Sequence, residues 1–395
     1  MPPLLASAVV ANSAMVPLLP YLLATRMGWQ LWEVGLYSFA VTAITILLNR
    51  RASALVDRGT SAVLLCAVGG AAQVVAGVAA IGALRDPVFL VLVVPALATG
   101  GATVPVFYAM GRRAAVAAGR DLTRSNSALR LATSAGWVLG PAGSFALVGS
   151  ANAETSLVAV SASALVALAL LLSARRCLEV GPTDGPGPAA RKETSRSVAP
   201  GLPVRRRVRA AVALVFLLSF AHIATTTSLP LLLEAHAAVP ESGIGSVIAI
   251  KAAVEMVAIL LAPEVLARCS PRVALLLCSS MAVIAYGTYL LADGWALAAL
   301  ASVLEGGYYG LFAAVGLSWV QSFSPERVGW TTGAYMTGIY AGVLLASPVS
   351  GLVASAWLPG ITVLSMVAAG TAALVAAATT GTRIGAHDGP SRPPA

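Results

Sequence analysis

The chain has 395 residues, of which 58% are hydrophobic and only 10% are charged. Because soluble globular proteins carry about 25% charged residues, so few charges exclude a cytosolic enzyme, a secreted domain and a nucleic-acid-binding protein. The net charge of +9 does not alter this conclusion, since the arginines stand in short clusters between long apolar runs. The composition predicts an all-α membrane protein that crosses the bilayer many times.

Twelve apolar stretches are long enough to cross a bilayer as helices, which requires about 20 residues each. In lipid the backbone must satisfy its own hydrogen bonds, and these stretches are too long for the strands of a barrel. The predicted spans, in chain order, are residues 4–25, 31–49, 62–83, 88–110, 126–149, 155–174, 210–233, 241–262, 273–292, 295–320, 329–353 and 357–380.

A long central segment divides these spans into two sets of six. Its proline- and glycine-rich run, residues 181–188, is typical of a flexible linker. Residues 135–139 resemble residues 341–345, and a proline follows each stretch within a few positions, which indicates an internal duplication. The predicted organisation is an N-terminal half at 1–174, a cytoplasmic linker at 175–209, a C-terminal half at 210–380 and a flexible cytoplasmic tail at 381–395. Parallel six-helix pseudo-repeats are the architecture of the major facilitator fold.

Basic residues alternate between the loops of the two membrane faces. If the N-terminus is inside, 22 of the 25 arginines and lysines fall on the inner face. Arg26 and Arg85 then lie outside, and Lys251 lies within a span. The positive-inside rule therefore predicts that both termini are cytoplasmic. The first span lacks a basic leader region and a cleavage site, so we expect it to be retained.

Motifs for ATP hydrolysis and for catalysis are missing from the sequence. It contains no G-x-x-x-x-G-K-[ST] phosphate loop and no credible H-E-x-x-H or G-x-S-x-G element. The four cysteines have no metal-type spacing, and we expect no disulfide, no metal and no cofactor. The chain is therefore predicted to be neither an enzyme nor an ATP-driven pump, which leaves ion gradients as its energy source.

The loop after the second predicted span, residues 49–59, resembles a degenerate form of the G-x-x-x-D-R-x-G-R-K signature of the major facilitator superfamily. Asp57 and Arg58 match its D-R pair. In that fold the N-terminus of the eleventh span lies nearby, and a positive helix end stabilises a carboxylate by about 0.3–1 kcal/mol. We expect Asp57 and Arg58 to belong to an inner gate; a solvated loop acid is the alternative.

Residues 136–143, in the fifth span, resemble the G-P-containing motif of exporters in the same superfamily. Gly136, Gly140 and Gly143 share a helix face at a spacing that lets a neighbouring helix approach closely. Pro141 frees a backbone carbonyl and permits a bend. The resemblance implies that this bend shapes the cavity and limits ion leak; ordinary close packing is the alternative.

Further stretches resemble the bacterial sugar efflux transporter family. The resemblance implies proton-driven export of sugars, glycosides or sugar-containing compounds. The stretches are 129–141, 253–256, 319–325 and 329–351.

Ionisable side chains within the spans are costly unless they are paired or hydrated, so they are candidates for function. Lys251 and Glu255 lie one helical turn apart. They form either a structural ion pair or a proton-coupling site, with Glu255 as the carrier and Glu305 as its competitor. The predicted substrate-binding residues are polar or aromatic and lie at comparable depths; interhelical bonding or packing is their alternative role. They are Asn12, Arg130, His222, Thr225, Thr226, Glu305, Tyr308 and Tyr309.

The sequence thus predicts a monomeric, multi-pass protein of the cytoplasmic membrane that acts as a proton-coupled antiporter. Its expected partners are a sugar or glycoside, protons and the lipid bilayer. Two alternatives remain open. One is a multidrug exporter whose carboxylates Glu255 and Glu305 attract lipophilic cations. The other is a transport-inactive sensor on the same scaffold.

Overall fold

The computed structural model describes residues 2–119, 122–178, 202–324 and 328–379. These residues form α-helices and one short 3₁₀-helix, without a β-strand among them. The helices are α1 (Pro2–Thr25), α2 (Leu31–Asp57), α3 (Ala62–Ala83), η1 (Pro87–Phe89), α4 (Leu90–Gly101), α5 (Val104–Ala117), α6 (Leu122–Ser150), α7 (Ala153–Leu178), α8 (Leu202–Ala235), α9 (Glu241–Arg268), α10 (Pro271–Leu290), α11 (Trp295–Gln321), α12 (Val328–Ala356) and α13 (Gly360–Ala378).

Within these residues, twelve helical segments are long and apolar enough to cross a membrane, which confirms the predicted fold class. The fourth predicted span differs from the prediction of one continuous helix. It is interrupted at Ala102 and Thr103, between α4 and α5. Glycines at 100 and 101 weaken the helix, and Pro105 lacks the N–H that would continue the hydrogen bonding.

The central segment between the halves is shorter than predicted at both ends. Helix α7 continues to Leu178, and α8 already begins at Leu202. Arginine is a good helix former, so the basic residues that precede the apolar run extend α8. Residues 179–201 and the predicted tail at 381–395 lie outside the described residues.

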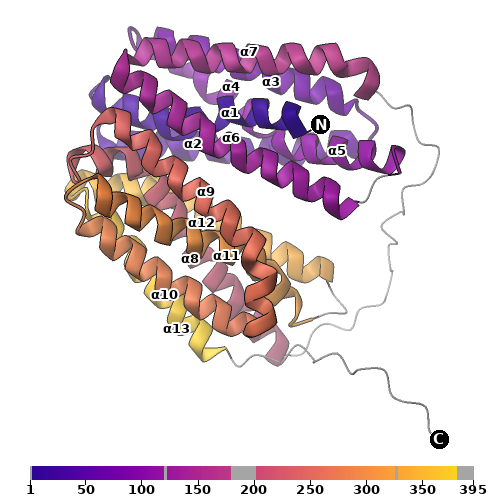
Figure 1. The fold of residues 1–395 in the computed structure, drawn as a ribbon, viewed down its shortest axis with the longest axis vertical. Helices are drawn as coiled ribbons and strands as arrows, with labels where there is room; N and C mark the ends of the chain where they lie inside the picture. The colour runs from indigo at the N-terminus through magenta and orange to yellow at the C-terminus, as the bar shows by residue number, and fades with distance from the viewer. Residues whose placement is uncertain (1, 120–121, 179–201, 325–327, 380–395) are drawn as a thin grey trace, which may run out of the picture.

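The helices form two groups that meet at one end and diverge toward the other (Figure 1). Helices α1 to α7 make up the N-terminal group, and α8 to α13 make up the C-terminal group. We call the end where they meet the closed end. We call the opposite end, where α1 begins and α2 ends, the arginine-rich end, because its exposed residues include Arg50, Arg51 and Arg268.

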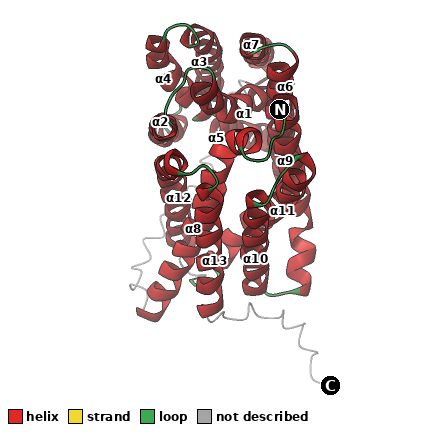
Figure 2. Cartoon of the chain, turned by 90° about the vertical axis from the view of Figure 1, so that its left-hand side faces the viewer, coloured by secondary structure: helices red, strands yellow, loops and turns green. Residues whose placement is uncertain are grey.

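Backbone-to-backbone contacts join the two groups at the closed end. Helix α2 lies beside α12, and α6 lies beside α9 (Figure 2). A Cβ atom added to Gly35 would lie 2.7 Å from the carbonyl oxygen of Ser347 and 3.0 Å from Cα of Gly351. One added to Gly245 would lie 2.8 Å from Cα of Ala142. The groups therefore approach as closely as glycine permits.

Polar contacts add to this junction. Arg26 Nη2 donates to Glu241 Oε1 at 2.8 Å, and the hydroxyl of Tyr21 donates to the same oxygen at 2.8 Å. On the other side, the backbone N–H of Trp32 donates to Ser355 Oγ at 2.9 Å. Each bond links the N-terminal group to the C-terminal group, so opening this end requires that all three break.

Candidate transport site

Two glycines let α11 approach α9 in the middle of the C-terminal group. A Cβ atom added to Gly306 would lie 3.0 Å from the backbone nitrogen of Glu255. One added to Gly310 would lie 2.8 Å from Cβ of Ala258. This close crossing places the side chain of Lys251 directly beside α11.

Lys251 and Glu305 form a buried ion pair between these two helices. Lys251 Nζ donates to Glu305 Oε1 at 2.7 Å and also to the hydroxyl of Thr226 on α8. The side chains of Lys251 and Glu305 are 5% and 0% exposed. The hydroxyl of Tyr289, on α10, donates to the second carboxylate oxygen at 3.0 Å. Both oxygens of Glu305 thus have partners, as a buried charge requires.

His222 and Tyr309 lie against this ion pair. Their rings stack with centroids 3.4 Å apart and planes inclined by 3°. His222 Nδ1 lies 3.4 Å from Glu305 Oε1, without hydrogen-bond geometry to any residue that the structure describes. We call His222, Thr226, Lys251, Glu305 and Tyr309 the Lys251–Glu305 cluster.

The intrahelical pair of Lys251 with Glu255, one of two roles that the sequence leaves open, is not formed. Lys251 turns to α11 instead, because the glycines of α11 bring Glu305 within reach across the helix contact. Glu255 is half-buried and makes no hydrogen bond or ion pair with another residue in the described part of the chain.

Thr225 and Tyr308 do not join the cluster. Thr225 is buried and donates to Ser365 on α13 at 2.9 Å. Tyr308 is fully buried and pairs its hydroxyl with that of Tyr286 on α10. Successive helix residues point about 100° apart, so Thr225 and Tyr308 face the packed interior while their neighbours, Thr226 and Tyr309, face the cluster.

Other predicted residues lie apart from the cluster. Asn12, on α1, accepts a hydrogen bond from Gln73 Nε2 on α3 at 2.7 Å. Arg58 is exposed and caps α2 at the arginine-rich end. Arg130 stands in α6 and Asp57 ends α2, but their side chains lie outside what the structure describes.

Two of the three predicted packing glycines face α1. A Cβ atom at Gly136 would lie 2.6 Å from Val9 Cγ1, and one at Gly140 would lie 2.6 Å from the carbonyl oxygen of Val10. Gly143 differs from the prediction, because it is exposed and no heavy atom lies within 4 Å of its added Cβ. Next to these glycines, Pro141 stands inside α6, and its carbonyl faces Gly245 of α9.

Gly140→Leu is therefore expected to destabilise the protein by about 1–3 kcal/mol, the usual cost of overpacking. Gly143→Leu is the matched control and should change the unfolding free energy little. Ala142→Leu is unsuitable as a control, because Ala142 packs against Gly245. Thermal unfolding of the purified variants measures both effects. Equal stability of Gly140→Leu and Gly143→Leu would contradict a close contact of α6 with α1.

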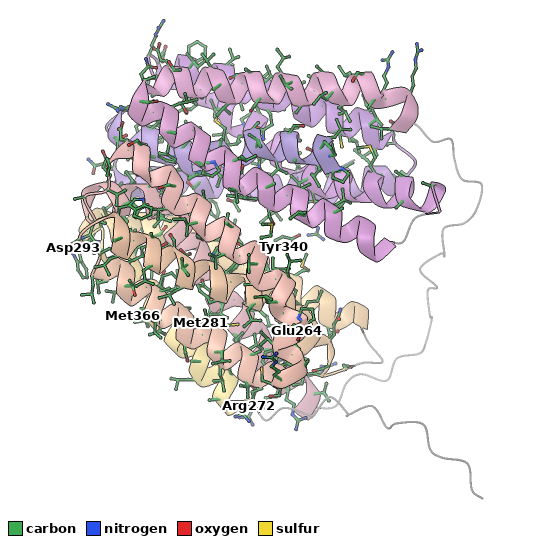
Figure 3. All side chains as sticks on the ribbon, viewed as in Figure 1. Glu264, Arg272, Met281, Asp293, Tyr340 and Met366 are labelled. Carbon is green, nitrogen blue, oxygen red and sulfur yellow. The ribbon has the colours of Figure 1, made fainter. Side chains whose placement is uncertain are left out.

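Some site residues were not predicted, although the sequence carries a signal for two of them. Gln73 is an amide in the middle of an apolar span, and Tyr289 follows Tyr286 at i+3. Tyr340, on α12, lies between the two groups in Figure 3 and is half-buried. Nothing in its local sequence separates it from a packing tyrosine.

Two groups of six spans, joined at one end, are the architecture of transporters of the major facilitator type. The chain belongs to the MFS_1 like family, whose family model matches residues 6–358. It is a transporter and not an enzyme. Its twelve apolar helices make it a multi-pass protein of the inner membrane.

Two curated relatives match this chain, and both are named sugar efflux transporter A. Sugar efflux transporter A of Escherichia coli (strain K12) is 24% identical over 356 residues, which cover 88% of this chain and 87% of that protein. Sugar efflux transporter A of Dickeya chrysanthemi is 25% identical over 355 residues, which cover 88% and 86%. The predicted resemblance to sugar efflux transporters is thereby confirmed.

Solved structures share the fold at lower identity. The crystal structure of nucleoside transporter NupG matches with a TM-score of 0.75 and 16% identity, over 95% of this chain and 96% of that one. A bacterial homologue of iron transporter ferroportin, in an inward-facing state, matches with a TM-score of 0.71 and 17% identity, over 95% and 97%. At these identities the similarity establishes the architecture alone.

Proposed function

We propose that the protein is a proton-coupled antiporter that exports sugars, glycosides or sugar-containing small molecules by alternating access, acting as a monomer. The curated relatives are named sugar efflux transporters, and this chain matches them over most of their length, which supports the substrate class. Sugars present hydroxyls for hydrogen bonds and flat faces for aromatic contact. Half-buried Tyr309 and Tyr340 offer such contact, and half-buried Asn12 offers hydrogen bonds.

The positive-inside rule supports the orientation in this proposal. The arginine-rich end then faces the cytoplasm with both termini, and the closed end faces outside. In this orientation the two groups diverge toward the cytoplasm (Figure 1), which supports an inward-facing conformation as part of the proposal. Asp57 and Arg58, at the arginine-rich end, would belong to the gate that closes when the outer end opens.

One observation supports coupling of transport to protons at Glu255. This residue is a half-buried carboxylate without a hydrogen-bond or ion-pair partner among the described residues, one turn from Lys251. Glu305 has both oxygens occupied by Lys251 and Tyr289, so it is less free to take up and release a proton. A neutral Glu255 costs less to enclose than a charged one. Glu255 therefore binds a proton when the site opens outward and releases it when the site opens to the cytoplasm, in exchange for substrate.

Glu255→Gln should abolish uphill export while leaving passive exchange intact. In inverted vesicles with an imposed pH gradient, accumulation of a radiolabelled sugar above its outside concentration should disappear. Exchange without a gradient should stay close to the wild-type rate, because the fixed amide still permits the substrate-loaded conformations to interconvert.

Glu264→Gln is the matched control, since Glu264 is an exposed carboxylate near the end of the same helix (Figure 3). It should transport normally. Uphill export at the wild-type rate in Glu255→Gln would transfer the proton site to Glu305. The wild-type vesicles also serve to screen candidate substrates. A sugar that does not accumulate under an imposed pH gradient is not a substrate of the proposed antiporter.

The partnerless carboxylate of Glu255 also favours a second candidate, a multidrug exporter of lipophilic cations. Competition distinguishes the two: a neutral glycoside should inhibit sugar export, whereas a cationic hydrophobic dye should not. Proton flux that depends on substrate in liposomes excludes the third possibility, a transport-inactive sensor.

A further inference from the structure

The break between α4 and α5 lies in the middle of a membrane span. Thr103 closes the last turn of α4, with its backbone N–H and its hydroxyl both donating to the carbonyl of Gly100, at 3.2 and 2.7 Å. Pro105 has no N–H, so the carbonyl of Gly101 lacks the donor of a continuous helix. Irregular backbone at membrane depth is tolerated only inside protein or beside a cavity, and broken helices recur at transporter binding sites.

Gln73 of α3 packs into this break. A Cβ atom added to Gly100 would lie 2.5 Å from Cδ of Gln73, so the amide occupies the space that the glycine leaves. The residue is 5% exposed. Its nitrogen donates to Asn12 Oδ1, but its Oε1 has no hydrogen-bond partner among the residues that the structure describes. An unpaired buried acceptor is unfavourable, so a missing partner is expected.

A crevice within the N-terminal group leads to this amide. Helices α1, α3, α5 and α7 line it, together with the end of α4, and no charged residue is part of its lining. It has room for one water-sized group. A Cβ atom at Gly101 would lie 3.5 Å from Asn12 Oδ1 and 3.5 Å from the methyl group of Thr45. Polar atoms of α1 and α3 therefore converge at the break.

We propose that Asn12, Gln73 and the α4–α5 break form a hydroxyl-binding subsite in the N-terminal group, separate from the Lys251–Glu305 cluster. A ligand hydroxyl donates to Gln73 Oε1 and accepts from the side-chain amide of Asn12. The subsite is neutral and has room for a single hydroxyl, so it suits one hydroxyl of an uncharged sugar whose ring stays outside the crevice. The proposal rests on the proposed function, since it takes the exported molecule to be a sugar.

Calorimetric titration of the purified full-length protein with deoxy sugars tests the subsite. The probes are methyl β-glucoside, methyl β-galactoside and lactose, followed by the monodeoxy derivatives of whichever sugar binds. In the wild type, loss of one particular hydroxyl should weaken binding about tenfold, the value of one hydrogen bond. In Gln73→Met, the parent sugar should bind about tenfold more weakly, and removal of that same hydroxyl should have no further effect.

Thr99→Val is the matched control, because the hydroxyl of Thr99 donates to the carbonyl of Pro95 within α4. It should retain the wild-type discrimination. Asn12→Ala provides a second test should Gln73→Met fail to fold, and it should lose discrimination at the same hydroxyl.

Two negative results have different meanings. If a sugar binds and the folded variants still discriminate every hydroxyl as the wild type does, the subsite is refuted and the crevice holds only a structural water. If the wild type binds none of the three parent sugars, the sugar assignment of the proposed function fails, and this inference fails with it.

Discussion

Lys251→Met is expected to lower the free energy of unfolding by about 3–5 kcal/mol, the cost of removing one partner of a buried ion pair. Glu305 would keep a hydrogen bond from Tyr289 but would lose its countercharge at a position with no exposed surface. The double variant Lys251→Met/Glu305→Gln should recover most of this loss, because the glutamine carries no charge and still accepts from Tyr289. Thermal unfolding in detergent measures all three proteins.

Arg26→Met is the matched control for this comparison. Arg26 pairs with Glu241 at 2.8 Å, but its side chain is 48% exposed, and exposed pairs contribute about 0.2–1 kcal/mol. The loss of stability should therefore be several times smaller than for Lys251→Met. A double variant as unstable as Lys251→Met alone would show that the lysine matters through its packing and not through its charge.

Gly310→Ala should destabilise the protein by about 1–3 kcal/mol, because the new methyl group meets backbone that cannot move aside. Its Cβ atom would lie 2.8 Å from Cβ of Ala258 and 3.0 Å from the carbonyl carbon of Glu255. Separation of α9 from α11 would also move Lys251 away from Glu305. We therefore expect a loss of transport together with the loss of stability.

Gly307→Ala is the control on the same helix. Its Cβ atom would meet only the terminal methyl group of Met281, at 2.9 Å, which a flexible side chain can withdraw. Melting temperature and transport should both stay close to the wild type. An equal loss of stability and transport in Gly307→Ala and Gly310→Ala would mean that α11 tolerates no added methyl group on either face. The close contact with α9 would then not explain the effect of Gly310→Ala.

The number and order of the spans followed from the sequence, because a bilayer imposes a length and a composition on every helix that crosses it. The predicted ends were wrong where the helix continues past the apolar run, as at α8, which begins at Leu202, since apolarity alone does not mark where a helix stops. The interruption of the fourth span was detectable in principle. Gly100, Gly101 and Pro105 stand within six positions, and together they disfavour a continuous helix.

The candidate site was predictable in composition but not in pairing. An ionisable residue within an apolar span is visible in the sequence, so Lys251, Glu255 and Glu305 could be named as candidates. Their partners depend on which helices cross and how closely, and the sequence supplies only a hint of this. The small-residue spacing of Gly306 and Gly310 was that hint, and the structure shows that it brings Glu305 to Lys251.

Two of the ion pairs that the described residues form respond differently to the surrounding solution. Mobile ions screen the partly exposed pair of Arg26 and Glu241, whereas the enclosed pair of Lys251 and Glu305 stays beyond their reach. Concentrated salt on the closed side thus weakens the junction there without loosening the interior. Since an exposed pair contributes at most about 1 kcal/mol, this screening shifts the ratio of closed to open molecules by no more than about fivefold. In the proposed alternating-access cycle, ionic strength on one face of the membrane therefore acts as a modest, one-sided bias.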